Sequence, residues 1–121
     1  CSPLLTASDL IEAFRILEST ATNFVYPVVE YPHPIFRSMR KSKNGKMEFV
    51  YPEHELTRTQ DLENVFHDAG QFYWGKAEAW RELKKMHTDG MGIEIPSYRV
   101  VDIDTEDDWK RAEMLSQSKL L

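Results

Sequence analysis

The chain has 121 residues and a mass of 14.2 kDa, enough for one domain with a buried core but not for two. Its net charge of -5 and its pI near 5.3 disfavour sequence-independent nucleic-acid binding, which needs a basic surface. No apolar run approaches the roughly 20 residues of a membrane span, and the single cysteine, Cys1, excludes an internal disulfide and fits a reducing, cytoplasmic compartment.

The first part of the chain predicts a helix followed by a strand. Apolar residues recur at helical spacing over residues 6–19, and Thr6 with Asp9 has the pattern of an N-terminal capping box. Residues 24–30 are rich in aromatic and β-branched side chains, which favours a largely buried strand. Because Pro27 cannot donate a ladder hydrogen bond, we expect this strand at a sheet edge or at a bulge.

The middle of the chain predicts a hairpin. Asn44-Gly45 stands between the runs 35–40 and 47–51, and this dipeptide is the strongest short-range signal for a turn whose two central residues have positive φ. Lysines crowd the turn, as expected for an exposed arm. Residues 52–66 lack periodicity and indicate a long loop or short helical turns.

The last part predicts further alternation of strands and helices, which indicates an α/β fold with an inserted hairpin. Ala77, Trp80 and Leu83 share one face of a predicted helix. Thr105 with Asp108 repeats the capping-box pattern. In chain order, we expect a strand at 70–74, a helix at 76–84, a loop at 89–92, strands at 93–95 and 98–103, and a helix after 105 carrying Trp109, Ala112 and Leu115.

Two aspartates at the end of the last predicted strand are candidate metal ligands. Residues i and i+2 of a strand point to the same side, so Asp102 and Asp104 can face one cation. Mg2+ is often held by one or two carboxylates together with substrate phosphates, and sites in α/β sheets lie beyond the carboxyl ends of strands. The alternative, equally open, is that Asp104 caps the following helix and Asp102 is a solvated strand end.

Two further segments offer polar groups for a ligand. In the block His-Asp-Ala-Gly-Gln-Phe-Tyr-Trp-Gly at 67–75, glycines permit close approach and Gln71 offers a donor and an acceptor; the alternative is a buried strand with a bulge. His67 beside Asp68 indicates a hydrogen-bonded surface pair rather than a catalytic dyad, since no nucleophile motif accompanies it. Arg58 suits carboxylate or phosphate recognition, or is a solvated loop residue.

Together these motifs resemble the acylneuraminate cytidylyltransferases, which make CMP-activated nine-carbon α-keto sugar acids. The likeness is carried by S-P-L-L-T-A-S-D-L at 2–10, R-T-Q-D-L at 58–62 and D-I-D-T-E-D-D at 102–108. The block at 67–75 is most similar to the pseudaminic acid branch, because Ala69 stands where sialic acid members tend to carry asparagine. Sialic or legionaminic acid are the other substrates left open.

The resemblance implies a Rossmann-like, mixed-sheet nucleotide-diphospho-sugar transferase domain, of which residues 1–121 are the C-terminal half. It also implies a homodimer in which a projecting arm, about residues 35–62, covers the partner's active site. The chain does not begin with Met, and the family's phosphate-binding pattern A-R-x-G-S-K-x-[IL]-x-x-K-N is absent from it. We therefore expect that the chain alone cannot bind CTP productively.

The family reaction is attack of the sugar's anomeric hydroxyl on the α-phosphate of CTP, with release of pyrophosphate. By motif, the resemblance makes Asp102 and Asp104 the catalytic carboxylates that hold Mg2+, which also lowers the pKa of the hydroxyl. It places Arg58 against the sugar acid or the phosphates, and Gln71 and Tyr73 in the sugar pocket. The alternative function is a catalytically inactive α/β module for dimerisation or binding.

Overall fold

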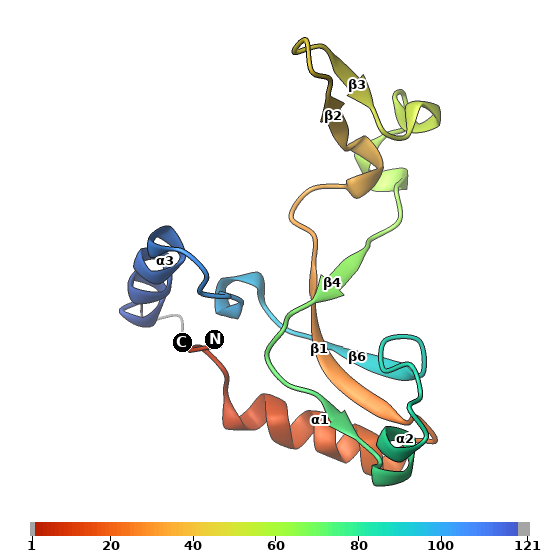
Figure 1. Ribbon diagram of the computed structural model, residues 1–121, viewed down its shortest axis with the longest axis vertical. Coiled ribbons are helices and arrows are strands. Elements are labelled where there is room, and N and C mark those ends of the chain that lie inside the picture. The colour runs from red at the N-terminus through yellow and green to blue at the C-terminus, as the bar shows by residue number, and fades with distance from the viewer. Residues whose placement is uncertain (1, 119–121) are drawn as a thin grey trace. The chain divides into compact units, whose positions relative to one another are not determined.

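The computed structural model describes residues 2–118, so Cys1 and the last three residues lie outside it. The chain forms two compact units. The sheet unit joins the residues up to Val29 with those from Asp68 onward, and the hairpin unit is Glu30–His67. Within the described residues there are three α-helices, a four-stranded sheet and a separate two-stranded hairpin, which confirms a mixed α/β fold (Figure 1). No helix in this range is both long and apolar enough to cross a membrane.

The sheet is organised around β1 (Phe24–Glu30), the predicted first strand. Its order is β4 (Phe66–Asp68), β1, β5 (Trp74–Gly75), and β6 (Gly90–Glu94) also pairs with β1. β1 is antiparallel to β5 and parallel to β6. It is therefore the central strand, and the expectation that Pro27 marks a sheet edge is wrong.

The position of Pro27 explains how a central strand tolerates a proline. Its carbonyl oxygen accepts a hydrogen bond from the backbone N of Ala69, 3.0 Å away and just after β4. The nitrogen and carbonyl of one strand residue point to the same side, so the Pro27 nitrogen faces residues 69–73, where β1 changes partner from β5 to β4. The β6 side uses the Val28 carbonyl, which accepts from Ile95 N at 3.0 Å.

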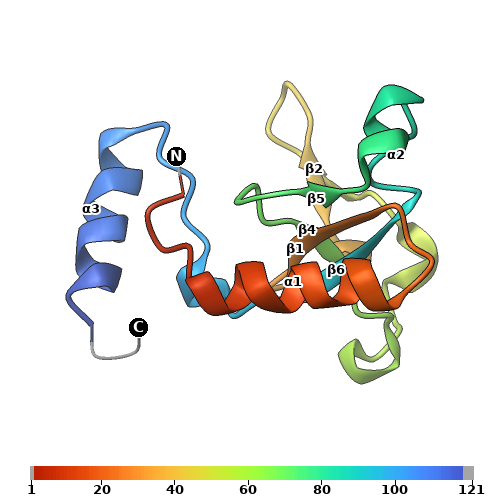
Figure 2. The ribbon, with the colours of Figure 1, turned by 90° about the horizontal axis from the view of Figure 1, so that it is seen from below.

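Helix α1 (Ala7–Ser19) begins as predicted, with the Thr6 hydroxyl accepting from Asp9 N. The helix lies beside the strands of the sheet (Figure 2), and the Trp74 indole donates to the Leu10 carbonyl at 3.0 Å. The predicted apolar face is only partly correct, because Ile11 remains 51% exposed. The core that joins helix and sheet consists of Ala13, Leu17, Val25, Ala69, Ile93 and Ile95.

The bounds of β4, β5 and β6 differ from the prediction. β6 begins with glycines, which have low strand propensity, and β4 and β5 are too short to show an alternating pattern. β6 begins at Gly90, inside the predicted loop 89–92. A Cβ on Gly92 would lie 2.9 Å from Val28 Cγ2, so glycine lets β6 lie close against β1. The predicted strand 70–74 is reduced to β5, and β4 lies earlier, at the end of a predicted loop.

Helix α2 (Ala77–Arg81) is shorter than predicted and buries a different face. Ala79 is its buried residue, whereas Trp80 and Leu83 are 46% and 88% exposed. Leu83 lies beyond the helix with φ 53°, in the left-handed region that ends a helix. The predicted face of Ala77, Trp80 and Leu83 is therefore correct only at Trp80, whose ring packs edge-on against the buried Phe24 with centroids 4.8 Å apart.

The predicted strand 98–103 is also wrong. Ser97–Arg99 forms a 3-10 turn, and residues 100–103 extend without pairing in a strand. Val101 is nevertheless buried, against Leu4 and Ala112 in a second small core. The last helix, α3 (Glu106–Ser116), has the complete capping box that the sequence predicts.

In the hairpin unit, β2 (Met39–Lys41) and β3 (Met47–Phe49) form the predicted antiparallel pair. Gly45 has φ 88° and its N donates to the Ser42 carbonyl at 3.0 Å, while Asn44 has no positive φ. The turn is thus a longer loop with a left-handed glycine, not a two-residue turn. Short 3-10 turns at Pro52–His54 and Thr59–Asp61 are as expected for residues 52–66. Ile35–Arg37 also forms a 3-10 turn, so the first half of the predicted run 35–40 is not a strand.

Candidate functional site

The carboxylate of Asp68 is the centre of a polar cluster in the sheet unit. Its Oδ1 accepts from Gly70 N at 2.7 Å, and its Oδ2 accepts from the Tyr73 hydroxyl at 2.9 Å. The same Oδ2 lies 2.8 Å from Nε2 of His87, which is on the segment between α2 and β6. The structure therefore joins the predicted sugar-pocket residue Tyr73 to Asp68 and to a histidine far away in the sequence.

Burial, hydrogen bonds and charges in this cluster shift the pKa values of Asp68 and Tyr73. Burial acts to raise the pKa of Asp68, but the hydrogen bonds from His87, Gly70 and Tyr73 outweigh it and hold the pKa below its ordinary value. Burial, the hydrogen bond to Asp68 and the negative charges of Asp68 and Asp102 raise the pKa of Tyr73 to about 12. The Tyr73 phenol is therefore a hydrogen-bond donor throughout the neutral pH range.

Sequence reasoning missed His87. The sequence predicts His67, the neighbour of Asp68, as its partner, and this pairing stays a prediction; the His67 ring contacts Tyr31 with centroids 4.8 Å apart. His87 stands nineteen positions after Asp68, and no local pattern connects the two. Only the return of the chain from α2 to β6 brings them together.

Asp102 and Asp104 lie on the extended segment before α3, and both are exposed. The negative charge of Asp102 contributes to the raised pKa of Tyr73. Asp104 lines an open hollow of about 580 Å³ together with Trp109, Lys110 and other residues of α3. The expected alternative that Asp104 caps the helix is wrong, because Thr105 is the N-cap.

The donor chemistry of these two aspartates fits Mg2+. Carboxylate oxygens are hard ligands, and Mg2+ commonly takes one or two of them and completes its shell with water and substrate phosphates. Among residues 2–118 no three His, Cys, Asp or Glu side chains are grouped to hold a metal ion. An all-protein cage is therefore not formed within these residues.

Gln71 is hydrogen-bonded to the backbone of Arg99, whose side chain forms a buried ion pair with Asp9. Its Nε2 donates to the Arg99 carbonyl at 2.7 Å. The Arg99 guanidinium binds both carboxylate oxygens of Asp9, at 2.5 and 3.2 Å, and its Nη1 also donates to Thr6 Oγ1 at 3.2 Å. Asp9 is only 6% exposed. The predicted capping acid therefore also anchors the segment that orients Gln71, a role for Arg99 that no sequence motif indicates.

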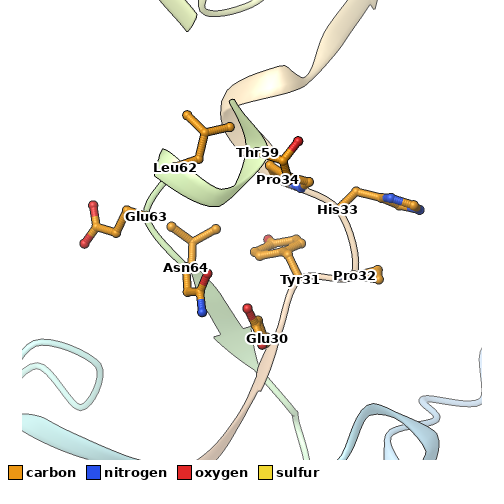
Figure 3. Close-up of a pocket in the computed structure, with 10 residues that line it drawn as sticks. Glu30, Tyr31, Pro32, His33, Pro34, Thr59, Leu62, Glu63 and Asn64 are labelled. Carbon is orange, nitrogen blue, oxygen red and sulfur yellow. The ribbon is translucent and has the colours of Figure 1, made fainter. Parts of the chain in front are cut away.

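Arg58 belongs to the hairpin unit, where its Nε lies 2.9 Å from Asp61 in an exposed ion pair. The adjoining Thr59 and Leu62 line a cavity of about 180 Å³, together with residues 30–34 and 63–65. Figure 3 shows the Tyr31 ring between the two lining segments, whereas His33 and Glu63 extend outward. Arg58 itself is not among the lining residues, so the cavity and the predicted anion-binding side chain are distinct features.

Comparison with known proteins identifies homologues of the chain. Two pseudaminic acid cytidylyltransferases, from two strains of Campylobacter jejuni subsp. jejuni, are each 32% identical over 117 residues, which is 94% of this chain and 50% of each relative. A Helicobacter pylori protein, named pseudaminic acid cytidylyltransferase and UDP-2,4-diacetamido-2,4,6-trideoxy-beta-L-altropyranose hydrolase, is 34% identical over 104 residues, 84% of this chain and 20% of that protein. No protein-family profile matches the chain. The chain spans about half the length of its Campylobacter relatives and is, over most of its own length, a homologue of the pseudaminic acid cytidylyltransferases.

Proposed function

We propose that the chain is the C-terminal part of a cytidylyltransferase that joins CTP to a nine-carbon α-keto sugar acid, with pseudaminic acid as the favoured substrate. The observation that carries this proposal is the identity of 32% that extends over 94% of the chain. Sialic or legionaminic acid are the alternative substrates. The fold that goes with this function is a partial, Rossmann-like nucleotide-diphospho-sugar transferase domain.

In the proposed reaction the anomeric hydroxyl oxygen of the sugar bonds to the α-phosphorus of CTP, and pyrophosphate leaves with the electron pair of the broken bond. Asp102 and Asp104 would hold Mg2+, which when bound would supply neutralisation of phosphate charge and a lower pKa of the hydroxyl. Tyr73 lines the sugar pocket with its hydroxyl hydrogen-bonded to Asp68, and Gln71 lines the same pocket with its amide oriented by the Arg99 carbonyl. Arg58 binds an anionic group of the sugar acid or of the nucleotide.

The hairpin unit supports a homodimer. In the antiparallel register Met39 pairs with Phe49 and Lys41 pairs with Met47. The apolar side chains of Met39, Met47 and Phe49 therefore share one face of the hairpin. The Arg40–Glu48 ion pair lies on the opposite face. Met39 and Met47 are 49% and 48% exposed. A two-stranded hairpin is marginal alone in water, and we propose that a second copy of the protein covers this face.

The test measures CMP-sugar formation from CTP and each sugar acid with the complete gene product that contains these residues. Asp102→Asn with Asp104→Asn is expected to lower kcat by at least about 100-fold, the scale of losing electrostatic stabilisation of the transition state. Asp107→Asn is the matched control, because Asp107 is exposed on α3 and pairs only loosely with Lys110, at 3.6 Å. A double variant that keeps full activity refutes the metal assignment.

Two outcomes separate the enzyme from the inactive binding module. We expect the 121-residue chain alone to form no CMP-sugar, and product formed by it contradicts its assignment as the second half of the domain. Titration of the chain with Mg2+ by calorimetry is expected to show binding that the Asp102→Asn, Asp104→Asn variant loses. Absence of any metal affinity in the unmutated chain, with no product from the complete protein, favours the binding module.

A further inference from the structure

We infer that His87 is the catalytic base that accepts the proton of the attacking sugar hydroxyl, and that Asp68 is the positioning residue that orients it. This inference rests on the proposed function and adds a residue to it that none of the sequence motifs includes. The observations that carry it are the hydrogen bond between Asp68 and His87, the contacts that fix the imidazole, and the place of both residues beside Tyr73.

The hydrogen bond sets the tautomer of His87. Nε2 lies 2.8 Å from Asp68 Oδ2, and a carboxylate only accepts hydrogen bonds, so Nε2 carries the proton. In the neutral imidazole the lone pair is then on Nδ1. Asp68 cannot turn away, because Gly70 N and the Tyr73 hydroxyl hold it from other directions at 2.7 and 2.9 Å.

The His87 ring is fixed yet accessible. Its ring meets the Tyr26 ring edge-on with centroids 5.3 Å apart, and the Tyr26 hydroxyl donates to the His87 carbonyl at 3.0 Å. The side chain is still 59% exposed. No group in residues 2–118 forms a hydrogen bond with Nδ1. An oriented, solvent-facing acceptor is the arrangement that general-base catalysis requires.

The dyad lies beside the proposed sugar pocket. One oxygen, Asp68 Oδ2, accepts hydrogen bonds from both Tyr73 and His87. The charge of Asp102, a proposed Mg2+ ligand, acts on the same Tyr73 hydroxyl. The proton acceptor and the sugar-lining phenol are therefore both hydrogen-bonded to the same carboxylate oxygen in the sheet unit.

In the proposed step, proton transfer to His87 accompanies attack of the sugar hydroxyl on the α-phosphorus. Nδ1 of neutral His87 takes the proton of the anomeric hydroxyl while the hydroxyl oxygen forms its bond to the α-phosphorus of CTP. The bond from that phosphorus to the bridging oxygen breaks, and its electron pair leaves with pyrophosphate. His87 becomes an imidazolium that the Asp68 carboxylate stabilises, and it returns the proton to solvent after product leaves.

The kinetic test uses the complete gene product with CTP and pseudaminic acid. His87→Gln and His87→Ala are expected to lower kcat by about 100-fold or more, in the range of lost general-base catalysis, with KM changed less than about threefold. Added imidazole is expected to restore activity to His87→Ala but not to Asp102→Asn, because only the former lacks a proton acceptor. Thr88→Ala, exposed on the same loop, is the control and is expected to keep wild-type kcat.

A spectroscopic measurement tests the dyad without turnover. Long-range 1H–15N NMR spectra of the 121-residue chain are expected to show the Nε2–H tautomer at His87, and Asp68→Asn is expected to abolish this preference. An Nδ1–H tautomer, or a His87→Gln variant within fivefold of wild-type kcat, overturns the inference while the proposed function stands. A wild-type protein that forms no CMP-sugar from any of the sugar acids overturns the proposed function, and this inference with it.

Discussion

Removal of the Arg99 guanidinium is expected to destabilise the sheet unit far more than removal of an exposed cation. In Arg99→Met the Asp9 carboxylate loses both of its hydrogen bonds to Arg99 while remaining 6% exposed. Breaking a buried ion pair by removing one partner costs about 3–5 kcal/mol. Thr6 Oγ1 still donates to Asp9 at 2.7 Å, and the helix N-terminus favours the charge, so we expect about 3 kcal/mol.

The assay is urea unfolding followed by far-UV circular dichroism, with stabilities compared in a double-mutant cycle. The double variant Asp9→Leu, Arg99→Met removes both charges and is expected to lose no more than about 1–2 kcal/mol, since replacing a whole buried pair by apolar side chains is often neutral. Lys110→Met is the matched control, because its ion pair with Asp107 is exposed and contributes less than about 1 kcal/mol. The reasoning is refuted if Arg99→Met costs no more than Lys110→Met, or if the double variant is less stable than the single one.

Three further predictions concern other sites. Gly92→Ala is expected to lower the free energy of unfolding by about 1–3 kcal/mol, because its Cβ would lie 2.9 Å from Val28 Cγ2. The loss is measured as a lower melting temperature, and an unchanged melting temperature contradicts this. The hydrogen bonds of the α3 cap lower the pKa of Asp108. The stabilisation that ionised Asp108 contributes to the folded state is therefore complete above the ordinary aspartate pKa and is lost as the pH falls through the lowered pKa. Asp108→Asn should therefore reduce thermal stability at pH 7 but not near pH 2, and an equal loss at both would be inconsistent. Tyr73→Phe is expected to raise the pKa of Asp68 by removing one hydrogen bond and to remove the tyrosinate absorbance that develops near pH 12, as measured by NMR and ultraviolet titration.

The elements that local chemistry dictates could be predicted from the sequence. Helix α1, strand β1 and helix α3 appear where periodicity, β-branched residues and capping boxes place them. The hairpin was also predictable, because glycine at position 45 supplies the positive φ that the turn needs. The family relationship followed from short motifs, which need no knowledge of how the elements pack.

The tertiary structure alone decided which segments meet. Pro27 lies in a central strand because β1 changes partner beside it, and Gly90 begins a strand because Gly92 lets β6 approach Val28. Likewise Asp68 forms a hydrogen bond with His87, nineteen residues away. Hydrogen bonds between distant segments depend on the path of the whole chain, which periodicity and propensity do not encode. The candidate motifs were therefore visible in the sequence, but the Asp68 cluster that connects Tyr73 and His87 exists only in the folded protein.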